Sequence, residues 1–276
     1  MTHIETRDGT RLFTKVWGEG KPVVLIHGWP LTADTWDSVA LALANDGYKA
    51  ISYDRRGFGR SDQPWNGYNY DTLSDDLADI MKATGATQDA TIIGFSMGGG
   101  EVARYMTRHA GKGLIKAGLI SSIVPYMLKT DDNPNGVKED VLNEMVKGMK
   151  TDRAAFMKDF LKDFYGVKKA KNPVSDAYLQ RSWNMCMMAG LRPTLACAEA
   201  FAYTDFRDEL QAFEVPTLVI HGTADETVPI DATGRPAADG IKHAKFIEYD
   251  GAPHGLFATH KEQFIKDIRG FVAQDV

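Results

Sequence analysis

Hydrophobic residues along this chain alternate between two patterns, one typical of buried strands and one typical of helices. A continuous apolar run, as in a buried parallel strand, occurs at Pro22–Ile26, and a short apolar, β-branched run occurs at Ala90–Phe95. Further strands are predicted at Tyr48–Tyr53, Ala117–Ser121, Val215–His221 and Lys245–Tyr249. Segments with helical spacing occur at Trp36–Ala44, Leu73–Met81, Met97–Met106 and Phe264–Val272. Residues Arg11–Trp17 alternate between polar and apolar, as a half-exposed strand does. This alternation predicts an α/β fold with a mostly parallel sheet.

Two of these helices carry signals for their ends. Gly47 follows the first helical segment at a place where glycine commonly ends a helix. Asp71 precedes the second and is predicted to be its N-cap, with Gly85 beyond its end.

The alternation stops between Val124 and Phe206, where no convincing strand occurs and the pattern favours amphipathic helices. We therefore divide the chain into an α/β core of residues 1–123 and 207–276 and a helical lid of residues 124–206. The lid leaves the strand Ala117–Ser121 at the carboxyl ends of the strands, where open α/β sheets bind ligands. The alternative is a set of surface helices with no bearing on a site.

Composition narrows the class of protein. The chain has 276 residues and a net charge of −5 without a basic cluster, which argues against a nucleic-acid partner. No stretch has the length of a membrane span, and the first residues lack the apolar core of a signal peptide. Two cysteines, Cys186 and Cys197, are too few for a disulfide framework, so we expect a cytoplasmic protein with free thiols. No C-x-x-C, H-E-x-x-H or P-loop motif is present.

Residues 94–98 read GFSMG, which matches the G-x-S-x-G nucleophile elbow of serine hydrolases. The strand before Ser96 and the helix after it are the context that this motif requires. The turn forces the serine into a strained backbone conformation, and side chains at Gly94 or Gly98 would clash. Its hydroxyl then stands at a helix N-terminus, which favours developing negative charge. The alternative is a glycine-rich turn with an idle serine.

A serine nucleophile needs a base, and the base needs an orienting carboxylate. His254 lies in the loop after the last predicted strand, and Asp225 lies just after the strand that ends near His221. Both are therefore expected at the sheet edge where Ser96 stands, in the order Ser, Asp, His of the α/β-hydrolases. The alternative acids are Asp231 and Asp250.

The remaining histidines have weaker positions. His27 and His221 end strands and are expected to hold loops by hydrogen bonds. The others are expected at a loose N-terminus (His3), on the helix after the elbow (His109), before a strand (His243) and at the start of the last helix (His260).

Acyl transfer also needs N–H donors for the tetrahedral oxyanion. One is expected to be the amide of Met97, which follows the nucleophile. The second is expected from the loop His27–Pro30 after an early strand. Trp29 supplies that N–H, because Pro30 has none.

Four motifs in order, HGWP (27–30), YDRRGFGRSD (53–62), GFSMGG (94–99) and APHG (252–255), resemble those of the bacterial arylesterases and cofactor-free haloperoxidases, or perhydrolases, of the α/β-hydrolase superfamily. The resemblance runs from about Thr10 to Phe271 and is looser in the lid. It implies a Ser96–His254–Asp225 triad, oxyanion amides at Trp29 and Met97, neither metal nor haem, and a homo-oligomer, trimeric or larger. By position it also implies an apolar acyl or alcohol pocket beside Trp29 and Pro30, lined by Phe160, Phe164 and Val228. The alternative for the last three is plain core packing.

Two positions refine the resemblance. Dehalogenases and epoxide hydrolases carry Asp at the elbow, so Ser96 argues against both. Pro30 resembles the haloperoxidase branch, whereas Leu at this position resembles the plain esterases. Proline restricts the backbone of Trp29, and our hypothesis is that it aims the Trp29 carbonyl at a bound peroxide.

The sequence thus predicts a serine carboxylesterase for small, uncharged aryl or short-acyl esters, with peracid formation when hydrogen peroxide replaces water. Such a peracid oxidises halide away from the enzyme. The alternatives are a lactonase, an amidase or a C–C hydrolase with the same triad, or a small-molecule receptor with a vestigial triad. Turnover of an activated aryl acetate separates the receptor from the enzymes.

Overall fold

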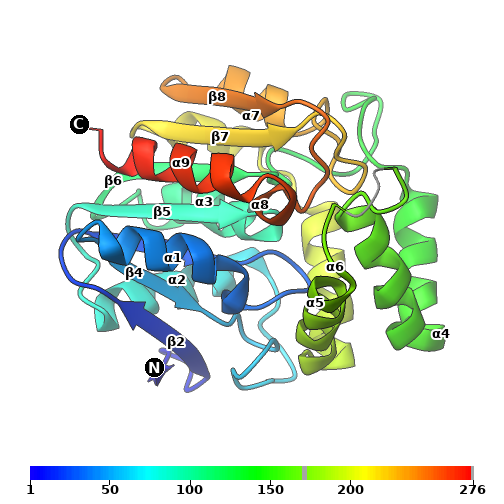
Figure 1. The fold of residues 1–276 in the computed structure, drawn as a ribbon, viewed down its shortest axis with the longest axis horizontal. Coiled ribbons are helices and arrows are strands. Elements are labelled where there is room, and N and C mark those ends of the chain that lie inside the picture. The colour runs from blue at the N-terminus through cyan, green and yellow to red at the C-terminus, as the bar shows by residue number, and fades with distance from the viewer. Residues whose placement is uncertain (170–172, 275–276) are drawn as a thin grey trace.

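An eight-stranded sheet forms the centre of the computed structural model, which describes residues 1–169 and 173–274 (Figure 1). Its spatial order is β1-β2-β4-β3-β5-β6-β7-β8. The strands span β1 Thr2–Glu5, β2 Arg11–Trp17, β3 Pro22–Ile26, β4 Lys49–Tyr53, β5 Ala90–Phe95, β6 Leu114–Ile120, β7 Thr217–Gly222 and β8 Ala244–Tyr249. Among the strands of the described residues, only the pairs β1–β2 and β2–β4 are antiparallel. The predicted α/β fold with a mostly parallel sheet is confirmed.

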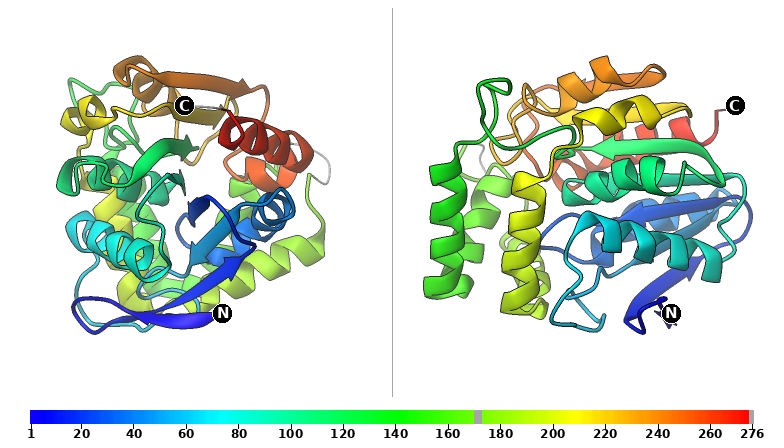
Figure 2. Two further views of the ribbon diagram at one scale, coloured as in Figure 1. Left: turned by 90° about the vertical axis from the view of Figure 1, so that its left-hand side faces the viewer. Right: turned by 180° about the vertical axis from the view of Figure 1, so that it is seen from behind.

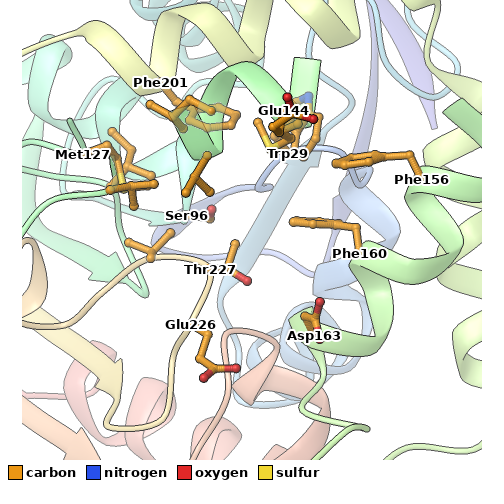
Figure 3. A pocket seen from close by; sticks show the side chains of 16 residues that line it. Trp29, Ser96, Met127, Glu144, Phe156, Phe160, Asp163, Phe201, Glu226 and Thr227 are labelled. Carbon is orange, nitrogen blue, oxygen red and sulfur yellow. The ribbon is translucent and has the colours of Figure 1, made fainter. Parts of the chain in front are cut away.

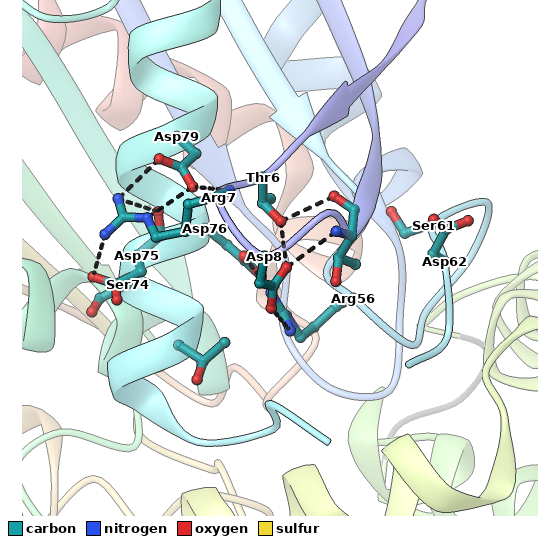
Figure 4. A network of polar contacts seen from close by, with 12 residues as sticks. Thr6, Arg7, Asp8, Arg56, Ser61, Asp62, Ser74, Asp75, Asp76 and Asp79 are labelled. Atoms are coloured by element: carbon teal, nitrogen blue, oxygen red, sulfur yellow. Dashed lines mark hydrogen bonds and ion pairs between the residues drawn. The ribbon is translucent and has the colours of Figure 1, made fainter. Parts of the chain in front are cut away.

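The N-terminal residues form a strand rather than the loose segment that was expected. His3 lies in β1, opposite Phe13 of β2, and its ring packs edge-on against the Phe13 ring at 5.6 Å. The predicted loose N-terminus is therefore wrong. A polar network also holds this hairpin, since Arg56 pairs with Asp76 through two hydrogen bonds of 2.6 Å and with Asp8 at 2.9 Å (Figure 4).

Helices cover both faces of the sheet (Figures 1 and 2). Helices α1 (Asp37–Asn45) and α9 (Lys261–Val272) contact each other on one face, and α2 (Tyr70–Ala83) and α3 (Met97–Arg108) contact each other on the opposite face. The shorter helical elements are η1 Ala33–Trp36, η2 Arg207–Ala212, α7 Gly234–Gly240 and α8 Leu256–Thr259.

The predicted N-cap of α2 is wrong by two residues. The backbone is still extended at Asn69, with φ −113° and ψ 160°, and the Asn69 side chain accepts the amide of Thr72 at 3.0 Å. Asp71 lies instead in the first helical turn, where it pairs with Arg104.

The described part of the lid segment contains three helices: α4 (Glu139–Phe164), α5 (Asp176–Met188) and α6 (Leu191–Tyr203). They stand side by side beyond the carboxyl ends of the parallel strands (Figures 1 and 2). Helix α4 is kinked at Asp152, whose φ of −152° is not helical. The Asp152 carboxylate accepts the amide of Ala155 at 3.0 Å, so it caps the second half of α4. Across the described segments, none of the helices has the length and apolar character of a membrane span.

Candidate active site

The turn between β5 and α3 presents Ser96 at its apex. The φ of Ser96 is +54° and its ψ is −119°, a conformation that residues other than glycine rarely adopt. A Cβ on Gly94 would lie 2.3 Å from the carbonyl oxygen of Gly98, and one on Gly98 would lie 2.7 Å from that of Ile26. The strained serine and the two obligatory glycines are as the pentapeptide predicts.

Asp225 and His254 reach Ser96 from two loops at the carboxyl ends of β7 and β8. The Ser96 hydroxyl lies 3.0 Å from Nε2 of His254, and Nδ1 of His254 lies 2.6 Å from Oδ2 of Asp225. All three side chains are buried. The alternative acids are engaged elsewhere: Asp231 pairs with Arg235, and Asp250 accepts the hydroxyl of Thr223. The structure therefore brings together the three residues that the sequence selected.

Four donors surround the carboxylate of Asp225. Its Oδ1 accepts the amides of Thr227 at 3.0 Å and Val228 at 2.8 Å, and its Oδ2 faces His254 and, at 3.3 Å, Nε2 of His221. Burial alone would raise the pKa of Asp225, but the charge of His254 and the hydrogen bonds from His221 and His254 lower this pKa to about 2. The carboxylate is therefore ionised at neutral pH.

The contact of His221 with Asp225 was not predicted from the sequence. Its Nε2 lies 2.9 Å from the carbonyl oxygen of Val228, which fits the expected role in holding a loop. The same nitrogen also faces Asp225, so it must carry the proton. The available signal was its spacing, four residues before the acid at the end of one strand.

Two free amides flank Ser96. Met97 is the first residue of α3, so its N–H has no partner within the helix. The loop that carries Trp29 lies against Ser96, since a Cβ on Gly28 would be 2.9 Å from Cβ of Ser96. Within the described residues, the Trp29 amide forms no hydrogen bond. Both amides are therefore available for an oxyanion.

A buried ion pair ties this loop to α3. Arg55 donates to the carbonyl oxygen of His27 at 2.6 Å and to Oε1 of Glu101 at 2.5 Å. Glu101 also accepts the hydroxyl of Tyr53 at 2.6 Å. Burial and the charge of Arg55 hold the pKa of His27 well below its ordinary value, so His27 stays neutral and accepts the Arg55 amide.

The side chain of Trp29 packs between the core and the lid helices. Its indole N–H donates to the carbonyl oxygen of Thr194 in α6 at 3.0 Å, and its ring packs edge-on against Phe160 and Phe201. The backbone and side chain of one residue thus link the oxyanion loop to two lid helices.

A cavity of about 370 Å³ opens between Ser96 and the lid (Figure 3). Apolar side chains dominate its walls, and three carboxylates lie at its edge, each paired with a lysine. The lining residues are Trp29, Ser96, Ile123, Met127, Val137, Val141, Leu142, Glu144, Met145, Phe156, Phe160, Asp163, Phe201, Glu226, Thr227 and Val228.

The structure separates the predicted pocket residues into two groups. Phe160 and Val228 line the cavity, as does Trp29. Phe164 does not: it is fully buried, and its ring packs edge-on against the His254 ring at 4.8 Å. Pro30 is buried and also lies outside the lining, after a cis peptide bond with Trp29. The two pocket assignments at 164 and 30 are therefore wrong for this cavity.

The described residues contain no group of three or more His, Cys, Asp or Glu side chains arranged to hold a metal ion. Cys186 and Cys197 are free and buried in α5 and α6, where burial raises the pKa of each thiol to about 12.

Comparison with known proteins places the chain in a class. Residues 21–261 match the α/β-hydrolase fold family. The chain is 42% identical to a non-heme chloroperoxidase of Kitasatospora aureofaciens, over 97% of this chain and 98% of the relative. It is 37% identical to a bifunctional esterase/perhydrolase of Acinetobacter calcoaceticus, with 99% of each chain covered. A bromoperoxidase structure from Bacillus anthracis superposes with a TM-score of 0.95 at 38% identity, again over 99% of each chain.

The protein is therefore a hydrolase. It belongs to the α/β-hydrolase family, and its similarity to non-heme haloperoxidases and to an esterase/perhydrolase confirms the resemblance that the four motifs indicated.

Proposed function

We propose that this protein is a serine carboxylesterase that acts on small aryl or short-acyl esters and forms peracids when hydrogen peroxide is present. The observation that carries the proposal is the continuous hydrogen-bonded relay from Ser96 through His254 to Asp225, which opens into an apolar cavity. The names of the esterase/perhydrolase and haloperoxidase relatives support both activities.

In the proposed reaction His254 takes the proton of Ser96 as the hydroxyl attacks the ester carbonyl. Asp225 holds His254 in the tautomer that accepts this proton and stabilises the imidazolium that forms. The amides of Trp29 and Met97 donate to the oxyanion, and the alcohol leaves with the proton from His254. Water, deprotonated by His254, then cleaves the acyl-enzyme and restores Ser96.

Hydrogen peroxide can take the place of water in the last step. The acyl group then leaves as a peracid, and Ser96 regains its proton through His254. The acyl-enzyme itself can form from a carboxylic acid with release of water, so no ester is required. Pro30→Leu tests the hypothesis about the Trp29 carbonyl: an unchanged ratio of perhydrolysis to hydrolysis contradicts it.

The cavity supports a small, uncharged substrate. A volume of about 370 Å³ is near the lower end for ligand pockets. Its walls offer apolar surface, and each carboxylate at its edge is paired with a lysine, so no unpaired cation among these groups favours an anionic acyl chain.

Steady-state hydrolysis of p-nitrophenyl acetate by the wild type and by Ser96→Ala tests the proposal. A parallel assay supplies acetate, peroxide, bromide and a halogenation dye. The esterase requires multiple turnovers that vanish in Ser96→Ala, and the perhydrolase requires a dye signal that vanishes with them. A wild type that is folded yet stops at one equivalent of p-nitrophenol contradicts the esterase and favours a receptor.

A further inference from the structure

Two of the residues that line the cavity together with Ser96 are methionines. Met127 follows β6 and Met145 lies on the first half of α4, and both line the same cavity as Ser96 (Figure 3 labels Met127). Met127 is only 2% exposed, so its thioether is reached through the cavity rather than from bulk solvent. Neither residue takes part in the proposed hydrolysis.

We propose that Met127 and Met145 are modification sites, converted to sulfoxides by the peracid that Ser96 generates beside them. This inference rests on the proposed perhydrolase function. The peracid transfers its terminal peroxide oxygen to the thioether sulfur, the O–O bond breaks, and the carboxylic acid leaves with the proton. The sulfur is oxidised by two electrons and the peracid is reduced by two, so no further reactant is needed.

The peracid is formed inside the cavity, and this confinement is the physical reason why it should oxidise Met127 and Met145 before other methionines. One molecule held in about 370 Å³ corresponds to about 4.5 M, far above any bulk concentration that a dilute enzyme can produce. Each new peracid therefore meets the cavity thioethers before it meets any other methionine. The chain contains 11 methionines, which supply internal controls for this argument.

Other methionines differ from this pair in a way that can be measured. Met1 and Met188 are exposed, at 80% and 43%, and lie outside the cavity lining. Oxidant arriving from bulk solvent reaches them first. Met106 and Met157 are buried away from the cavity and are expected to resist both sources. The location of the sulfoxides thus reports where the peracid was made.

A sulfoxide at either site changes the cavity. It places a strongly polar S=O group among apolar walls, where it has to find a hydrogen-bond partner or a water molecule. We expect KM for a short-chain p-nitrophenyl ester to rise severalfold as the two sites become oxidised. The rate of peracid formation would then fall during turnover with peroxide, whereas the rate of hydrolysis without peroxide would stay constant.

The test incubates the wild type with acetate and hydrogen peroxide and maps every methionine by peptide mass spectrometry. Ser96→Ala under the same conditions, wild type with peroxide alone, and wild type with added peracetic acid are the comparison samples. We expect Met127 and Met145 to be oxidised before Met188 only in the wild type incubated with acetate and hydrogen peroxide. With added peracetic acid, we expect Met1 and Met188 to be oxidised first.

Two outcomes overturn the inference, and they are distinguishable. Without a dye signal for peracid, the proposed perhydrolase fails and the inference fails with it. With a dye signal, equal oxidation of Met127 and Met145 in wild type and Ser96→Ala overturns the inference alone.

A double variant provides an independent readout. Met127→Leu combined with Met145→Leu is expected to lengthen the half-life of activity under peroxide turnover severalfold relative to its own peroxide-free sample. Met188→Leu is the matched control and is expected to decay like the wild type. Decay of the double variant at the wild-type rate contradicts the inference.

Discussion

Replacing Asp225 by Asn should place the proton on the wrong nitrogen of His254. The amides of Thr227 and Val228 both donate to Oδ1, at 3.0 and 2.8 Å, so they hold the carbonyl oxygen of the new side chain on their side. The new NH₂ group then faces Nδ1 of His254, where Oδ2 stood 2.6 Å away. Because this group can only donate, Nδ1 becomes an acceptor and Nε2 carries the proton toward Ser96. A protonated Nε2 cannot take the serine proton.

The expected loss in kcat is about 10⁴-fold, the size found for this tautomer error in a serine protease, which corresponds to about 5 kcal/mol of transition-state stabilisation. The assay is steady-state hydrolysis of p-nitrophenyl acetate between pH 6 and about 9, with circular dichroism to confirm folding. Asp231→Asn is the matched control, because Asp231 is an exposed partner of Arg235 and should leave kcat unchanged. A loss of less than tenfold in folded Asp225→Asn refutes the argument from the two amides.

Three further predictions concern stability and packing. The pKa of Asp225 is lowered from its ordinary 3.8 to about 2, so ionised Asp225 stabilises the fold above pH 3.8 by about 2 kcal/mol, and this contribution is lost as the pH falls toward 2. Urea unfolding of wild type and Asp225→Asn should give free energies of unfolding whose difference shrinks between pH 3.8 and 2. A difference that stays constant over this range contradicts the prediction. Glu101→Ala leaves the buried charge of Arg55 without its partner and should lower the free energy of unfolding, measured in urea, by about 3–5 kcal/mol. A change below about 1 kcal/mol contradicts this and means that water takes the place of the carboxylate. Gly98→Ala places a Cβ 2.7 Å from a backbone oxygen and should lower both Tm and kcat, whereas Gly270→Ala, which meets no atom within 4 Å, should lower neither; equal effects of the two variants contradict the steric reason.

The sheet could be predicted because its central strands are continuous apolar runs. The first strand was missed, because Thr2–Glu5 is short and exposed and its only strong signal is the partner strand. The N-cap of α2 was misplaced because Asn69 and Asp71 are both good capping residues. The choice between them depends on where the backbone leaves the extended region, and that angle is not encoded in residue type alone.

The grouping of Ser96, Asp225 and His254 could be predicted in full and the cavity lining only in part, for a physical reason. Ser96, Asp225 and His254 each follow a strand and carry a local motif, so topology brings them to one edge. Phe164 was assigned to the pocket by its position in the family resemblance. A matching position does not show whether a buried side chain faces a cavity or, as here, the ring of His254.

The position of the relay along the chain also determines when activity can first arise. Ser96 lies in the first half of the sequence, whereas Asp225 and His254 follow β7 and β8 near its end. A growing polypeptide on the ribosome therefore exposes its nucleophile long before it possesses a base. Under the proposed mechanism, a nascent chain or fragment that ends before residue 254 carries an unactivated Ser96 hydroxyl and should not hydrolyse esters.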